Sequence, residues 1–69
     1  MEKNRLREVL NAEGIIPAAL ARETGIAPAT IARYLKGGKP KEAYVSKIMI
    51  AINKMASTKK YDRSEVFPN

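Results

Sequence analysis

The sequence predicts a compact all-α domain of four helices followed by a short fifth element. Apolar residues recur at helical spacing in four separate segments. Residues 17–37 also have the composition that two helices need to cross tightly through a short turn. Glycines that can end a helix stand shortly before prolines that can begin the next one, in the pairs Gly14 and Pro17, Gly25 and Pro28, and Gly38 and Pro40. With 69 residues, the chain has room for one domain, which we expect to span residues 1–69.

The first helix is expected from Lys3 to Ala12. Leu6, Val9 and Leu10 fall on one face of this segment, and charged residues occupy the other faces. Gly14 follows and is expected to end the helix.

The second and third helices form a pair that is joined by a three-residue turn. Leu20, Ile31 and Leu35 supply apolar anchors, and Ala21 is small where the two axes must approach closely. Gly25 can adopt the left-handed conformation that reverses the chain after a helix. The expected ranges are Pro17 to Thr24 and Pro28 to Lys36, with each proline at a first helical position, where its missing N–H is not needed.

A basic connection leads to the fourth helix, which is expected from Lys41 to Ala56. Its apolar stripe consists of Val45, Ile48, Met49, Ile52 and Met55. The tail, residues 57–69, is either flexible or a short helix. Asp62 and Glu65 have the spacing of a capping box, Val66 and Phe67 would dock the helix, and Pro68 limits its length.

Five residues carry a family resemblance: Leu20, Ala21, Gly25, Ile26 and Ile31. Their spacing resembles the DNA-binding unit of the phage-repressor and Cro-like, or lambda-repressor-like, helix-turn-helix family. The run from Ala29 to Leu35 is also similar to the recognition helix of lactose-repressor-type proteins, but that family begins with the motif itself, whereas here a helix precedes it. The phage-repressor resemblance implies that residues 28–36 enter the major groove of duplex DNA.

The same resemblance implies that the bases are contacted by Pro28, Ala29, Thr30, Ala32 and Arg33, with Ala27 beside them. The short side chains lack the paired donors and acceptors that Gln or Asn offer to adenine, but their methyl groups can meet thymine methyl groups. Arg33 is the one long donor and can bridge O6 and N7 of a guanine. The alternatives for Arg33 are a phosphate contact or an ion pair with an acid such as Glu23.

Phosphate contacts are expected from backbone N–H groups at the start of the second helix, near Ala18 and Ala19. Ile16 stands where the family often has a polar capping residue, so basic side chains are expected to add to this site. The candidates are Arg22, Lys36, Lys39 and Lys41; for Lys41 simple solvation is an equal alternative.

Composition excludes several classes of function. The chain has no Cys and no His, which removes thiol nucleophiles, imidazole bases, disulfides and the usual zinc ligands, so we expect no enzyme activity, no metal and no cofactor. The net charge of +6 has the sign that a polyanion attracts. No apolar run approaches the ~20 residues that span a bilayer, and Met1 to Asn4 do not open a signal peptide. We therefore expect a cytoplasmic protein, bacterial or phage-encoded by its resemblance.

We expect the chain to be a sequence-specific transcriptional regulator, a small Cro-like or repressor protein that binds a palindromic site as a homodimer. Candidate dimer contacts are Ile50, which lies opposite the apolar stripe of its helix, and Tyr61, Val66 and Phe67, unless the tail residues simply complete the core. One alternative is a protein-interaction or antitoxin-like accessory module. Another is a weakly specific DNA-targeting module of a recombination or transposition system.

Overall fold

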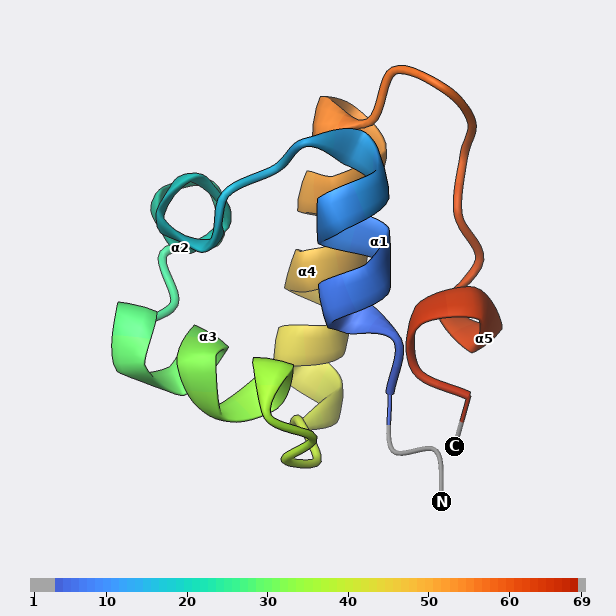
Figure 1. The fold of residues 1–69 in the computed structure, drawn as a ribbon. Coiled ribbons are helices and arrows are strands. Elements are labelled where there is room, and N and C mark those ends of the chain that lie inside the picture. Colours follow the sequence, from blue (N-terminus) through green and yellow to red (C-terminus); the bar gives the residue numbers. More distant parts are fainter. Residues whose placement is uncertain (1–3, 69) are drawn as a thin grey trace.

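A computed structural model describes residues 4–68, and within that range every regular element is a helix, which confirms the all-α prediction (Figure 1). None of the described helices has the length and apolar character needed to cross a membrane. The helices are α1 (Leu6–Glu13), α2 (Pro17–Thr24), α3 (Pro28–Leu35), α4 (Glu42–Met55) and α5 (Arg63–Val66).

Two glycines end helices by the mechanism that the sequence predicts. Gly14 and Gly25 have φ angles of 69° and 76°, in the left-handed region that glycine adopts without steric cost. After α1, the N–H of Ile15 donates to the carbonyl of Leu10 at 2.9 Å, which forms a Schellman motif. After α2, the N–H of Gly25 donates to the carbonyl of Ala21 at 2.8 Å. These bonds satisfy carbonyls that the helix ends would otherwise leave unpaired.

The helix boundaries agree with the predicted ones to within one residue, except at the start of α1. The predicted start, Lys3, lies outside the described residues, and α1 begins at Leu6. The side-chain oxygen of Asn4 accepts the N–H of Leu6 at 3.1 Å, so the chain turns into the helix at this point.

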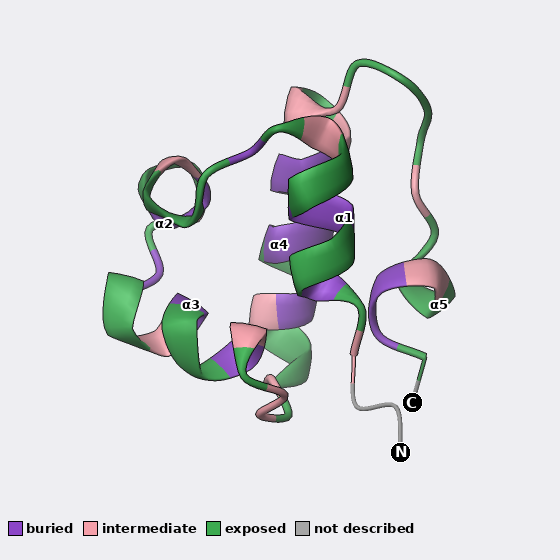
Figure 2. Cartoon of the chain, in the orientation of Figure 1, coloured by how far each residue is buried: buried purple, intermediate pink, exposed green. Residues whose placement is uncertain are grey.

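The core lies between α1, α4 and the α2–α3 pair, with α5 closing the far side (Figure 1). Helix α2 packs against both α3 and α4, and α1 contacts α3. Figure 2 shows that buried and exposed residues alternate along α1 and α4, as expected for helices with one face on the core. The buried core residues are Leu6, Val9, Leu10, Ile15, Leu20, Ala21, Ile26, Ile31, Tyr34, Val45, Ile48, Met49, Ala51, Ile52, Val66 and Phe67.

The tail folds back onto the core. Asp62 and Glu65 form both bonds of the predicted capping box at the start of α5. Val66 is completely buried and Phe67 is 4% exposed, and the N–H of Arg5 donates to the carbonyl of Val66 at 2.7 Å. Val66 and Phe67 therefore complete the core of their own chain, which is the alternative to a dimer contact that the sequence left open for them.

Candidate nucleic-acid interface

The turn between α2 and α3 is held by one side chain that the sequence analysis did not single out. The hydroxyl of Thr24 donates to the carbonyl of Leu20 at 2.8 Å and accepts the N–H of Ile26 at 3.2 Å. Ile26 is buried, so it anchors the turn in the core. The angle between α2 and α3 is thereby fixed from both sides of Gly25.

Helix α3 divides cleanly into an inner and an outer face. Ile31 is completely buried and Tyr34 is 4% exposed on the inner face. On the outer face, Thr30 is half-buried, and the residues exposed to solvent are Ala27, Pro28, Ala29, Ala32 and Arg33. The structure therefore presents the predicted base-contacting residues on one side of α3.

Arg33 is exposed and makes no ion pair within the described residues. The proposed alternative partner, Glu23, instead accepts the ammonium group of Lys54 at 2.7 Å. The turn after α3 closes tightly on Arg33, since its carbonyl accepts the N–H of Gly38 at 3.0 Å. A Cβ atom on Gly38 would lie 3.0 Å from that carbonyl oxygen and 3.1 Å from Cγ of Arg33, so a glycine at this position permits the close approach.

Charge is distributed unevenly over the chain. The sequence has no acidic residue from Thr24 to Lys41, and this stretch carries Arg33, Lys36, Lys39 and Lys41, all of them exposed. None of these four forms an ion pair in the described part of the chain. The ion pairs lie elsewhere: Arg5 with Glu8, Lys54 with Glu23, Lys59 with Glu65 and Arg63 with Glu42. The acid-free stretch thus leaves a surplus of positive charge around α3.

A helix-turn-helix family model matches residues 6–54, well over half of the chain. The chain belongs to the helix-turn-helix family, a family of DNA-binding domains. No curated protein and no solved structure showed significant similarity to it. The sequence-based assignment is thereby confirmed at the level of the helix-turn-helix family and of DNA binding, which is not an enzymatic function.

The start of α2, where the sequence predicts phosphate contacts, differs between its first two N–H groups in this helix-turn-helix domain. The N–H of Ala19 donates to the carbonyl of Ile16 at 3.0 Å and is therefore engaged at the helix start. The N–H of Ala18 has no partner among the described residues. Ile16 is 62% exposed and offers no capping side-chain bond. Arg22, in the last turn of α2, is exposed and forms no ion pair in the described range.

A residue outside the predicted motif supports the end of α3. The side-chain nitrogen of Asn4 donates to the carbonyl of Tyr34 at 3.0 Å and lies 3.4 Å from the carbonyl of Gly38. Sequence analysis missed Asn4 because these partners lie 30 and 34 residues away in the chain. The helix-turn-helix is thereby tied to the segment before α1.

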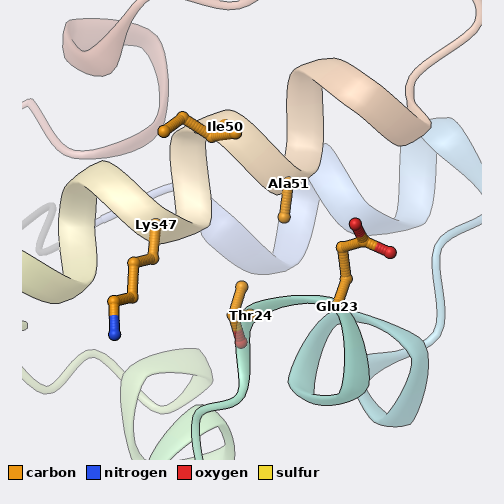
Figure 3. A pocket seen from close by; sticks show the side chains of 5 residues that line it. All are labelled: Glu23, Thr24, Lys47, Ile50 and Ala51. Carbon is orange, nitrogen blue, oxygen red and sulfur yellow. The ribbon is translucent and has the colours of Figure 1, made fainter.

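Ile50 lies on the outer face of α4, as helical periodicity predicts, and is 70% exposed. It borders a hollow of about 220 Å³ between α4 and the end of α2, which Glu23, Thr24, Lys47 and Ala51 also line (Figure 3). Tyr61 is half-buried, and its hydroxyl donates to Glu13 at 2.6 Å. Of the predicted dimer contacts, Ile50 is therefore the one whose side chain the fold leaves most accessible.

Proposed function

We propose that this chain is a sequence-specific regulator of transcription, a small Cro-like or phage-repressor-like protein that binds duplex DNA with α3 in the major groove. The observation that carries the proposal is the surface around α3. The outer face of the N-terminal half of α3 is exposed. The exposed cations Arg33, Lys36, Lys39 and Lys41 lie in a stretch, from Thr24 to Lys41, that has no acidic residue. A duplex backbone is the polyanion that such a surface fits.

The exposed residues of α3 differ in how far their side chains can reach toward the bases. Arg33 is long enough for a bidentate contact to a guanine, whereas Pro28, Ala29, Thr30 and Ala32 can make only short-range contacts with base edges. The phosphates are contacted by the N–H of Ala18 and by the side chains of Arg22, Lys36, Lys39 and Lys41. Each neutralised phosphate steepens the fall of affinity with salt by about 0.9 in log–log slope.

The regulator acts as a homodimer on a palindromic site, because one recognition helix contacts too few base pairs to select a site in a genome. Two copies related by a two-fold axis present two α3 helices one turn of DNA apart. The exposed Ile50 face is our candidate for the contact between the copies.

The test is selection of binding sites from random duplex DNA, followed by measurement of affinity for the selected site and for bulk DNA across salt. The Arg33→Ala variant is compared with wild type. We expect a palindromic site, and for Arg33→Ala a loss of about 5- to 150-fold with relaxed preference at one guanine per half-site. Arg7→Ala removes an equal charge from the exposed face of α1 and is expected to keep the guanine preference.

Two other results would contradict the proposal. If no sequence is enriched and Arg33→Ala weakens binding to all DNA equally, the chain is a weakly specific targeting module. If binding is weak and insensitive to salt, the exposed Ile16 and Ile50 indicate a protein-interaction module instead.

A further inference from the structure

The outer face of α3 has a chemical character that narrows the kind of base it can recognise. From the turn to the middle of the helix, the exposed apolar side chains are Ala27, Pro28, Ala29 and Ala32, which end in carbon atoms. Thr30 is half-buried. The first polar residue along this face that is exposed is Arg33. The leading half of the helix therefore presents methyl and methylene groups.

Base edges in the major groove differ in what they offer to such a surface. Guanine, adenine and cytosine present hydrogen-bond donors and acceptors, which lose water without compensation when an apolar group covers them. Thymine alone adds a C5 methyl group, and contact between that methyl and an Ala or Thr methyl is favourable. An apolar helix face thus favours thymine, because it can contact the methyl group. It disfavours the other bases, because it removes water from their polar edges without replacing the lost hydrogen bonds.

We propose that α3 selects its site by packing Ala29 and Ala32 against thymine C5 methyl groups, next to a guanine contacted by Arg33. This inference rests on the proposed DNA-binding function and names the base chemistry that the function uses. The three residues lie on one side of the helix, since Ala29 is followed at i+3 and i+4 by Ala32 and Arg33. Ala29 and Arg33 are about 6 Å apart along the axis, so the thymines and the guanine fall within about two base steps.

Electrostatics favours DNA over a protein as the occupant of this apolar face. The face is bordered by Arg33 and Lys36 in the acid-free stretch, with Lys39 and Lys41 following in the same stretch. An apolar protein surface gains nothing from this concentration of unpaired cations, whereas a DNA groove has phosphates along both edges. The short side chains also let the helix backbone approach the base edges closely, which methyl-to-methyl contact requires.

The experiment replaces each thymine of the selected site, one at a time, with deoxyuridine. This change removes only the C5 methyl group and keeps every hydrogen-bonding group of the base. We expect the affinity of the wild-type protein to fall about fourfold for each contacted methyl group, at one or two positions per half-site. Deoxyuridine at uncontacted positions should leave the affinity unchanged.

A matched pair of variants tests whether the thymine methyl group is contacted by Ala29 of α3. Ala29→Gly removes the methyl group at the second residue of α3, and Ala43→Gly does the same at the second residue of α4, where Ala43 is also exposed. The two changes have the same cost for helix formation. At the position that Ala29 contacts, we expect Ala29→Gly to bind the site with thymine and the site with deoxyuridine with equal affinity. Ala43→Gly should keep the fourfold difference in affinity between the two sites.

The outcomes separate this inference from the function on which it rests. If a site is selected but no deoxyuridine substitution weakens binding by the wild-type protein, the methyl contact is absent and the DNA-binding proposal stands. If no duplex sequence is selected at all, the proposed function itself fails, and the apolar face is left for a protein partner.

Discussion

Both the oxygen and the nitrogen of the Asn4 side-chain amide form hydrogen bonds. The oxygen accepts the N–H of Leu6, and the nitrogen donates to the carbonyl of Tyr34 at 3.0 Å. One residue therefore fixes the start of α1 and the end of α3 at the same time. The bond is partly buried, so a carbonyl that loses it is only incompletely compensated by water.

Two substitutions at Asn4 separate its roles. Asn4→Ala removes both bonds, and we expect the free energy of unfolding to fall by about 1–2 kcal/mol. Asn4→Asp keeps the acceptor for Leu6 but turns a second acceptor toward the carbonyl of Tyr34, so it should be no more stable than Asn4→Ala at neutral pH. Its stability should recover as the pH falls and the carboxyl gains a proton to donate.

Urea denaturation at pH 7 and about pH 3.5 measures these changes. Asn11→Ala, on the exposed side of α1, is the control and should unfold no earlier than wild type. An Asn4→Ala variant with an unchanged urea midpoint would show that the amide bonds contribute nothing to stability.

At the scale of the elements, Glu13 joins the end of α1 to the loop between α4 and α5. Its carboxylate accepts the hydroxyls of Thr58 and Tyr61 and the N–H of Ser57. The bonds from Thr58 and Tyr61 lower the pKa of Glu13 below its ordinary value of 4.5. The hydrogen bond to Glu13 raises the pKa of the Tyr61 hydroxyl, since it stabilises the protonated form of that hydroxyl.

The lowered pKa of Glu13 predicts how stability depends on pH. A carboxylate with a lower pKa in the folded state contributes stability that is fully present above pH 4.5 and is lost as the pH falls through the folded value. Glu13→Gln should therefore unfold at lower urea than wild type at pH 7, and the difference between the two should shrink toward about pH 3.

The control for this pH series is Glu8→Gln, which removes an exposed carboxylate on α1 that pairs with Arg5, the residue just before the helix. Such pairs contribute little, so its urea midpoint should stay close to that of wild type throughout. A constant difference between wild type and Glu13→Gln from pH 7 to about pH 3 would contradict the assigned role of the carboxylate.

The elements that sequence predicts well are those whose signals are local. Gly14 and Gly25 end helices, and Pro17 and Pro28 begin them, because backbone sterics within a few residues decide both outcomes. The Glu13 contacts join residues 44 to 48 positions apart, so no local pattern marks them. Asn53 pairs with both backbone groups of Tyr61, eight residues further along the chain, and thereby orders the start of the tail.

At the scale of the whole molecule, burial decided which predicted contacts are available. Helical periodicity placed Ile50 outside correctly, because the faces of a single helix follow from its own sequence. Whether Val66 and Phe67 are exposed or buried depends instead on where the tail packs. The tail packs on the core, so both residues are buried. The acid-free stretch from Thr24 to Lys41 could have been found in the sequence, but only the structure shows that its cations form no ion pair within residues 4–68.

The exposed Ile50 face leads to a prediction about assembly. A two-fold axis through this face would bury Ile50 of each copy, together with the hollow beside it (Figure 3). Because the contact is made twice, one substitution removes two buried isoleucines. Ile50→Glu should weaken dimerisation by about 100-fold or more and reduce cooperative binding to a palindromic site. Its folding stability should change little, since Ile50 is 70% exposed in the monomer.

Sedimentation equilibrium over a range of protein concentrations checks this prediction. The matched control is Ile16→Glu, a change at the other large exposed isoleucine of the described residues, which is 62% exposed and lies at the start of α2. Wild type and Ile16→Glu should show the same monomer–dimer equilibrium, and Ile50→Glu should sediment as a monomer. Equal association of all three proteins would mean that copies meet through another surface, and monomers throughout would mean that any pairing occurs only on DNA.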